Sequence, residues 1–262
     1  MAELSIIIPN YNTKDFLGKC LNSIKKNAPS CSYEVIVVDD ASTDNSIEMI
    51  KKKFPEVKLI KNKKNLGFSK SLNAGIRNSK GNFVLLLNSD TIILPNAFDE
   101  MLSALKGNKE AGIAGCRLLN KDNSVQFTFG YFPFFSTFIK RNIFGFRLKE
   151  KNEPFPVDWV CTACFLIKRK TIKETGLLDE DFAAYNEEVD YCYRAKKKGL
   201  LTLYVPNASI IHLQGGAINK KGPEYMKENT LKSNYVFLKK HKGIYEALLA
   251  VIFLKLRYLL GK

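Results

Sequence analysis

The stretch FVLLLNSDT, residues 83–91, decides the fold of this 262-residue chain. An unbroken apolar run that stops at short polar residues is typical of a strand buried on both faces, and such strands belong to parallel sheets covered by helices. Ligands and metal ions bind these sheets at the carboxyl ends of the strands, which is where Asp90 lies. Asn, Ser and Asp are also common turn residues, so this stretch by itself favours an ordinary strand-to-turn junction.

Two earlier apolar runs end in the same way. Residues 4–8 are followed by PNYN (9–12), and residues 33–38 are followed by DDAS (39–42). Between the two runs apolar residues recur at helical spacing, and a second such pattern follows residues 42–44, which can cap a helix. The first half therefore alternates strands and helices. This order predicts an α/β fold with a mostly parallel sheet and helices on both faces.

Six motifs occur in order along residues 4–216. They are SIIIPNYN (5–12), EVIVVDDASTDNS (34–46), NLGFSKSLNAGI (65–76), LLLNSDT (85–91), NEEVDYCYRAKKKG (186–199) and YVPNASIIH (204–212). In this order they resemble inverting family 2 glycosyltransferases with a GT-A fold, and within these the rhamnosyltransferase-like enzymes of cell-surface polysaccharide synthesis. The resemblance implies a Rossmann-like nucleotide-binding sheet. It also implies transfer of a sugar from a UDP- or dTDP-linked donor to a hydroxyl of a saccharide or lipid-linked saccharide.

The resemblance implies which residues hold the donor. The ends of the first two strands and the loop at residues 65–73 would surround the nucleotide. Asp39 would lie at the polar edge of the base, Lys70 can reach phosphate, and Gly67 lets the backbone approach the ligand closely. The residues implied in donor binding are Pro9, Tyr11, Asn12, Asp39, Asp40, Ser42, Gly67, Lys70, Asn73, Asn88 and Ser89.

A divalent cation, Mg²⁺ or Mn²⁺, is expected because negative charge builds on the leaving diphosphate. The family's DxD-like motif corresponds to residues 88–90, and Asp90 is the implied direct ligand. Asn88 stands in place of a first aspartate, which removes one charge. The family's later histidine corresponds to His212, implied as a third ligand or a diphosphate contact, although a lone histidine on an apolar strand is usually a core residue.

A carboxylate base is also expected, because an acceptor hydroxyl is a poor nucleophile. Glu187 and Glu188 correspond to the family's acidic pair, near the start of a helix whose dipole such residues also suit. Helical spacing places Glu187 on one face with Asp190 and Arg194, while Glu188 points about 100° away. We predict that Glu188 is the base and that Glu187 supports it in an ion network with Asp190 and Arg194. Because glutamate replaces the usual aspartate at position 188, assignment to Glu187 stays open.

Residues 217–262 are predicted to form a basic, amphipathic helical region after a catalytic domain of residues 1–216. They hold ten Lys or Arg against three Glu, which is nearly half of the net charge of +15. The apolar segment 248–260 is shorter than the ~20 residues that a membrane-spanning helix needs. It is expected either to lie on an anionic membrane surface or to pack on the catalytic domain. His241, which lies between lysines, is expected to be solvated.

No signal peptide is evident, because residues 1–3 run directly into the first predicted strand. The six cysteines are then expected to be reduced thiols of a cytoplasmic protein, with a position at the inner face of the cell membrane as an open alternative. CTAC at residues 161–164 has the spacing of a zinc ligand pair, but zinc would need a second pair that the sequence does not supply.

Residues 127–155 hold nine of the eighteen phenylalanines, interleaved with basic side chains. Neither strand nor helix periodicity is regular here, which predicts an insertion or loop with aromatic anchors that faces the acceptor. The alternative is that most of these rings fill the core.

Two other functions stay open on the sequence. A nucleotidyltransferase would share the sheet, the metal-binding carboxylate and the nucleotide, but no Gly-rich, basic triphosphate loop follows the first strand. A nucleic-acid-binding protein would suit the charge of +15. The chain has no recognition helix or RNA-stacking signature, so no nucleic acid partner is expected.

Overall fold

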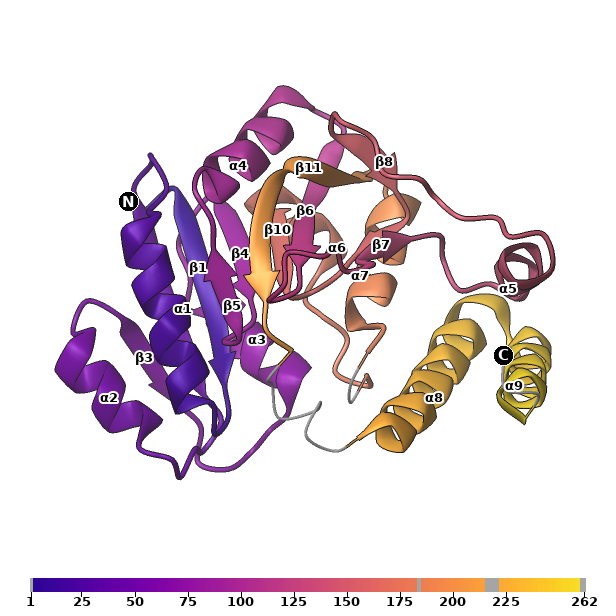
Figure 1. Cartoon of the computed structure of the whole chain (residues 1–262), viewed down its shortest axis with the longest axis horizontal. Coiled ribbons are helices and arrows are strands. Elements are labelled where there is room, and N and C mark those ends of the chain that lie inside the picture. The colour runs from indigo at the N-terminus through magenta and orange to yellow at the C-terminus, as the bar shows by residue number, and fades with distance from the viewer. Residues whose placement is uncertain (1, 183–184, 215–221, 260–262) are drawn as a thin grey trace.

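The strands and helices of the first half form as the sequence predicts. In the computed structural model, which describes residues 2–182, 185–214 and 222–259, each apolar run is a strand and each periodic segment is a helix (Figure 1). The elements are β1 (Leu4–Asn10), α1 (Lys14–Lys26), β2 (Tyr33–Asp39), α2 (Ser46–Lys53), β3 (Lys58–Lys61), α3 (Phe68–Arg77) and β4 (Phe83–Leu87).

The second half is less regular, because several of its strands are short. Its last two helices lie at the end of the molecule opposite to α2 (Figure 1). The elements are β5 (Thr91–Ile93), α4 (Ala97–Gly107), β6 (Ala111–Leu119), β7 (Phe129–Gly130), α5 (Phe135–Ile143), β8 (Phe155–Val157), β9 (Trp159–Val160), β10 (Cys164–Lys168), α6 (Arg169–Thr175), α7 (Glu187–Lys197), β11 (Leu201–His212), α8 (Pro223–Lys242) and α9 (Ile244–Leu259).

The order of the strands places a topological switch point between β1 and β4. The main sheet of the described chain runs β3-β2-β1-β4-β10-β6-β11-β5, with β8 paired to β11. β1 pairs in parallel with both β2 and β4, and the flanking helices α1 and α3 pack on opposite faces. Ligands bind α/β sheets at such a switch point, outside the carboxyl ends of the strands. The predicted parallel sheet is confirmed for this half, whereas β10, β5 and β8 run antiparallel to their neighbours.

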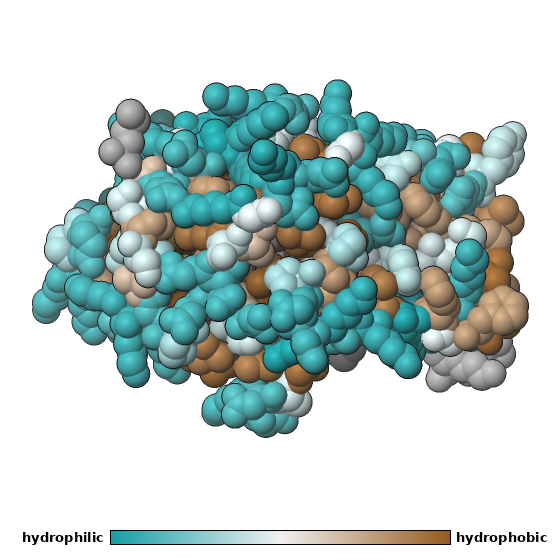
Figure 2. Space-filling model, turned by 90° about the horizontal axis from the view of Figure 1, so that it is seen from above, coloured by the Kyte–Doolittle hydropathy of each residue, from teal (hydrophilic) through white to brown (hydrophobic). Residues whose placement is uncertain are grey.

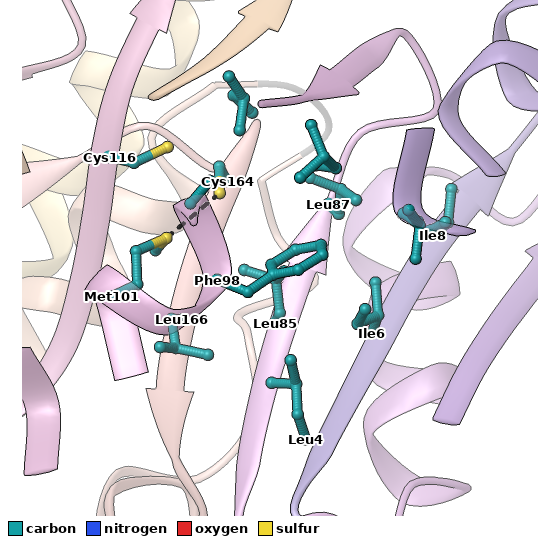
Figure 3. Packing of buried hydrophobic residues seen from close by; sticks show 14 of the residues in the cluster. Leu4, Ile6, Ile8, Leu85, Leu87, Phe98, Met101, Cys116, Cys164 and Leu166 are labelled. Carbon is teal, nitrogen blue, oxygen red and sulfur yellow. Dashed lines mark hydrogen bonds between the residues drawn. The ribbon is translucent and has the colours of Figure 1, made fainter. Parts of the chain in front are cut away.

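Two apolar layers cover the two faces of the sheet. On one face, alternate residues of β1 and β4 such as Ile6, Ile8 and Leu85 belong to the same apolar layer as Phe98 and Met101 of α4 (Figure 3). α1 and α2 complete this layer. The second layer contains α3, α6 and α7, and is extended by the aromatic segment, α8 and α9. Because successive strand residues are buried on opposite faces, the strands read as continuous apolar runs.

The phenylalanine-rich segment contributes to the core and also leaves rings on the surface. It contains β7, α5 and β8, so it is not a plain insertion. Four of its rings, each at most 5% exposed, belong to the second layer: Phe129, Phe132, Phe138 and Phe155. The rings that stay exposed are Phe127, Phe144 and Phe146.

α8 and α9 are joined at Gly243 and form a hairpin on the second layer. Phe237 of α8 and Ala250 and Leu254 of α9 are buried there. One side of α9 therefore packs on the rest of the protein, which is one of the two arrangements expected for this segment. Among the residues that the structure describes, no helix combines the length and apolar character that crossing a membrane requires. The predicted domain boundary after residue 216 lies outside the described residues.

His241 is buried, so the expectation that it is solvated is wrong. Its Nε2 lies 2.7 Å from Oδ1 of Asp190 in α7, and its side chain is 8% exposed. Asp190 is fully buried and accepts from Nε of Arg194 at 2.7 Å through its other oxygen. Asn186, just before α7, donates to Asn234 of α8 at 2.8 Å. The lysines on either side of His241 do not indicate whether it is buried, because successive residues of a helix point about 100° apart. α8 therefore holds the start of α7 in place.

We expect His241→Ala to lower the free energy of unfolding by about 1–3 kcal/mol, because it leaves the buried Asp190 with one partner fewer. His241→Gln, whose amide can still donate, should recover part of the loss. Urea denaturation followed by circular dichroism measures both. Lys239→Ala, at an exposed position of the same helix, should stay within about 0.5 kcal/mol of the original chain. A stability of His241→Ala equal to that control would contradict the structural role.

Candidate active site

A hydrogen-bonded chain of four buried residues joins the ends of β1, β2 and β4. Asn10 donates its Nδ2 to Oδ1 of Asp39 at 2.7 Å. Thr13 donates to Oδ1 of Asn10 at 2.7 Å, and its hydroxyl lies 2.8 Å from that of Ser89. All four residues are at most 8% exposed. The structure therefore brings Asp39 and Ser89, two of the predicted donor-binding residues, to the two sides of the switch point.

The loops that follow β1 and β2 are tied to each other by Ser42. Its hydroxyl accepts from Nδ2 of Asn10 and from the backbone N–H of Asn12, each at 3.0 Å. Its own backbone N–H donates to Oδ2 of Asp39 at 3.0 Å. Both oxygens of Asp39 are thus engaged by protein groups, and its contact with a nucleotide base stays a prediction. Pro9, near the end of β1, is partly buried, and Tyr11, on the loop that follows, is 38% exposed.

Asp40 holds the loop between β3 and α3. Its oxygens accept from Nδ2 of Asn62 and from the backbone N–H groups of Leu66 and Gly67, at 2.9 to 3.0 Å. Gly67 has φ of 92°, a left-handed conformation that only glycine adopts readily. Lys70, in the first turn of α3, is exposed. Asp40 therefore shapes the loop that the sequence predicts to lie beside the donor.

Asn73 is used for packing between elements. It is 1% exposed, and its Nδ2 donates at 2.9 Å to both the carbonyl of Leu178 and Oε1 of Glu180. Its Oδ1 accepts from the backbone N–H of Leu178 at 3.0 Å. Because both ends of its amide are bound to the loop before α7, a structural role is better supported than the predicted donor contact.

Asp90 and His212 meet at the carboxyl edge of the sheet. β5 and β11 pair so that His212 lies opposite Thr91, and the backbone N–H of Leu213 donates to the carbonyl of Asp90 at 2.9 Å. Nε2 of His212 lies 3.4 Å from Oδ1 of Asp90. Their side chains are 12% and 4% exposed. The structure thus brings together the two side chains that the resemblance implies as metal ligands.

Gln126 fixes the ring of His212, a role that no motif in the sequence indicates. Nε2 of Gln126 donates to Oδ1 of Asn120 and to the carbonyl of His212, each at 2.8 Å. Its Oε1 therefore faces Nδ1 of His212, at 3.1 Å. An amide oxygen can only accept, so Nδ1 carries a proton, and Nε2 is the ring nitrogen that is turned toward Asp90. A second partner that orients the ring in this way is typical of metal-binding histidines.

The residues at this edge fit a divalent cation. Within the described chain, Nε2 of His212 and Oδ1 of Asn88 are buried and have no hydrogen-bond partner. Together with a carboxylate oxygen of Asp90 they form a set of nitrogen and oxygen donors that suits Mn²⁺ or Mg²⁺. No three His, Cys, Asp or Glu side chains of the described residues form a metal-binding group. The remaining ligands would thus have to come from the donor's diphosphate and from water.

Glu187 and Glu188 begin α7 after two residues with left-handed backbone, Tyr185 (φ 65°) and Asn186 (φ 67°). In each glutamate Oε2 is buried and has no hydrogen-bond partner in the part of the chain that the structure describes. Burial raises the pKa of Glu187. Burial, together with the nearby Glu187, raises the pKa of Glu188 well above its usual range. A buried carboxylate with a raised pKa is suited to act as a general base.

The predicted ion network is only partly correct. Arg194 pairs with Asp190, and its other nitrogens donate to backbone carbonyls of residues 175–177. Glu187 is not a member of this network. Its Oε1 accepts instead from the hydroxyl of Thr162 at 3.1 Å. The guanidinium of Arg194 is already bound by Asp190 and by the carbonyls of residues 175 and 177.

The turn at residues 161–164 links the acidic pair to the sheet edge that carries Asn88 and Asp90. The carbonyl of Ala163 accepts from the backbone N–H of Asn88 at 3.1 Å, and the strand that follows pairs with β4. Burial, followed by the nearby charge of Glu188, raises the pKa of the Cys161 thiol to about 12. That thiol stays protonated at neutral pH. The sequence singled out this turn for its cysteines, whereas it is its threonine, Thr162, that contacts Glu187.

The chain matches the family model described as Glycosyl transferase family 2 over residues 5–176. It is 26% identical to the N-acetylglucosaminyl-diphospho-decaprenol L-rhamnosyltransferase of Mycobacterium tuberculosis (strain ATCC 25618 / H37Rv), and the match covers 93% of this chain and 87% of that protein. It is 27% identical to the poly(ribitol-phosphate) beta-glucosyltransferase of Bacillus spizizenii, with 91% of this chain and 40% of that protein covered.

Solved structures of glycosyltransferases share the fold. A mannosyltransferase of Pyrobaculum calidifontis, in complex with GDP-Man and Mn²⁺, has a TM-score of 0.66 at 16% identity, over 95% of this chain and 68% of that one. TarS of S. aureus has a TM-score of 0.60 at 17% identity, over 95% of this chain and 69% of that one. These likenesses establish the GT-A fold. Because the family model spans more than half of the sequence, the chain belongs to glycosyl transferase family 2.

Proposed function

We propose that this glycosyltransferase moves a sugar from a UDP- or dTDP-linked donor to a hydroxyl of a saccharide or lipid-linked saccharide, with inversion at the anomeric carbon. The observation that carries the proposal is the pair of glutamates at the start of α7. Both have a raised pKa and an Oε2 atom without a partner among the described residues. A single in-line displacement needs one base for the attacking hydroxyl, and this pair supplies it.

Glu188 is the proposed base. Its Oε2 takes the proton of the acceptor hydroxyl while that oxygen bonds to the anomeric carbon. The bond from the anomeric carbon to the diphosphate breaks at the same time, and the diphosphate leaves with the electron pair. Glu187, held by Thr162, raises the pKa of Glu188 by its negative charge and so makes Glu188 the stronger proton acceptor.

The donor is proposed to lie across the carboxyl ends of β1, β2 and β4. Asp90, His212 and Asn88 would hold a divalent cation beside its diphosphate, and Ser89 lies in the same strand-end loop. A bound cation of this kind neutralises charge on the leaving diphosphate. Lys70 is exposed on α3 and is proposed to pair with phosphate. The loops fixed by Asp39, Asp40 and Ser42 would then enclose the nucleoside.

The acceptor class is proposed from the relatives. One is named for a decaprenol-linked diphosphate sugar and another for a poly(ribitol-phosphate). Both of these names describe phosphate-bearing acceptors. A net charge of +15 attracts such acceptors over distance and speeds their encounter with the enzyme.

We expect Glu188→Gln to reduce acceptor-dependent turnover by ~10²–10⁴, because the amide keeps the shape of the side chain and loses its affinity for a proton. Donor affinity, measured by calorimetry, should change little. Glu187→Gln should cost less, since its partner Thr162 can still donate to an amide oxygen. Nuclear magnetic resonance of the product should show the anomeric configuration opposite to that of the donor. Retention of configuration, or full activity of Glu188→Gln, would exclude this mechanism.

The raised pKa of Glu188 predicts how stability depends on pH. In the unfolded chain a glutamate titrates near pH ~4.3. Above that pH the folded state binds more protons than the unfolded state, so stability falls as the pH rises toward the folded pKa. Glu188→Gln removes this loss, and its melting temperature should exceed that of the original chain by a margin that widens with pH. Glu110→Gln, at an exposed position, should show no such widening. A constant margin would refute the raised pKa.

The contact between Gln126 and His212 leads us to predict how donor binding depends on the metal ion. Gln126→Leu removes the contact that orients the ring of His212. We expect the Mn²⁺ concentration for half-maximal binding of UDP or dTDP to rise 10- to 100-fold, a typical loss for a partner of a metal ligand. Calorimetric titration of nucleotide at a series of Mn²⁺ concentrations measures this. Ser124→Ala, in the same loop, serves as the control. If the affinity of the original chain for nucleotide does not depend on the Mn²⁺ concentration, the cation has no part in donor binding.

A further inference from the structure

One side of α9 is apolar and exposed. The opposite side, with Ala247, Ala250 and Leu254, is buried against the second layer. A helix that is apolar all round is normally buried all round, yet nothing in the described residues covers this side. The exposed side chains lie within an arc of about 140° on a helical wheel. They are Ile244, Tyr245, Leu248, Leu249, Ile252 and Leu256, each between 45% and 83% exposed.

A second group of exposed apolar side chains follows directly on α5, which packs along α9. The backbone N–H of Phe135 donates to Oε1 of Glu246 at 3.1 Å, and the rings of Phe135 and Phe253 lie 6.0 Å apart. Hydrophobic residues gather at this end of the molecule (Figure 2). The second group is Ile143, Phe144 and Phe146, between 48% and 76% exposed. We call the two groups together the α5–α9 surface.

Three arginines gather beside the α5–α9 surface, one from α5, one from the loop after it and one from α9. The packing of α5 against α9 brings Arg141 and Arg257 to the same end of the molecule, and burial, then the like charges of Arg257 and Arg147, lower the pKa of Arg141. None of them forms an ion pair with an acidic side chain of the described residues. Lys255 lies at the edge of the same exposed arc. Clustered arginines without acidic partners favour an anionic ligand with several oxygens, such as a phosphate.

We propose that the α5–α9 surface docks on a membrane with anionic phospholipid headgroups. Its apolar side chains enter the boundary between headgroups and acyl chains, and the arginines bind headgroup phosphates. A second copy of this chain is the alternative occupant. It would bring two arginine clusters of the same sign together in a molecule of charge +15, which disfavours it.

The hairpin of α8 and α9 connects this surface to the active site. The ammonium of Lys227, early in α8, lies 5.7 Å from the ring centroid of Tyr258, so the end of α9 returns to the level of the start of α8. α8 is about 30 Å long and binds α7 through His241 and Asp190. The docked face therefore holds a fixed position relative to the catalytic glutamates. The inference rests on the proposed function only for the expectation that a lipid-linked acceptor lies in the same membrane.

Sedimentation with vesicles, in the absence of donor and acceptor, tests the docking surface. The original chain should bind vesicles of phosphatidylcholine with phosphatidylglycerol and should bind pure phosphatidylcholine much more weakly. Arg147→Gln and Arg257→Gln should each weaken binding about fivefold, and Ile252→Glu should abolish most of it. Val125→Glu and Lys52→Gln, at exposed positions elsewhere, are matched controls that should bind almost normally. Circular dichroism and melting temperatures confirm that each variant is folded.

Three results would overturn the docking surface. One is failure of the original chain to bind anionic vesicles at low salt, and another is equal binding to neutral and anionic vesicles. The third is a dimer in lipid-free sedimentation velocity that Ile252→Glu dissociates, since a second copy would then cover the surface. Transfer to a soluble acceptor is measured separately. A chain that binds vesicles but does not transfer sugar to a soluble acceptor refutes only the proposed function. A chain that transfers sugar but does not bind vesicles refutes only the docking surface.

Discussion

Asp39 ends a strand that is buried on both faces and Asp40 follows it, and a carboxylate can be buried at little cost only if hydrogen bonds replace the water it loses. Side chains and backbone N–H groups of the neighbouring loops supply these bonds: Asn10 and Ser42 for Asp39, and the 62–67 loop for Asp40. The conformations of the loops at this edge of the sheet follow from this requirement. The two glutamates of α7 are the contrasting case, because Oε2 of each has no hydrogen-bond partner among the described residues and burial raises the pKa of both side chains. Carboxylates with a full set of hydrogen bonds thus shape the loops, whereas each of these glutamates keeps one oxygen without a donor from the described chain.

The sequence predicted the parallel half of the sheet and its helices because these depend on local patterns. Continuous apolar runs and helical spacing are readable within ten or fifteen residues. The resemblance to a family added the strand-end aspartates and the acidic pair. It could not supply the partners of these residues. Gln126 reaches His212 across 86 residues, and Thr162 reaches Glu187 across 25. Such pairs are set by how the elements pack in space, and neither residue stands in a pattern of its own.

The errors have the same origin. His241 was expected in water because its neighbours in sequence are lysines, but a helix turns each residue toward a different side. Glu187 was assigned to Arg194 from spacing alone, although the carbonyls at the end of α6 and Asp190 take all three nitrogens of that guanidinium. The phenylalanine-rich segment and α9 have no regular polar side. In both segments the neighbouring elements decide which apolar side chains are buried. The periodicity of the sequence does not show which elements will pack there.

The link between His241 and Asp190 also bears on how the enzyme is made. The two residues are separated by 51 positions, so a ribosome working at roughly 5–20 residues per second needs about 3–10 s to proceed from one to the other. During that time the sheet and the start of α7 can form, while Asp190 still lacks its imidazole partner. The start of α7 is therefore fastened late in synthesis, only after α8 has emerged.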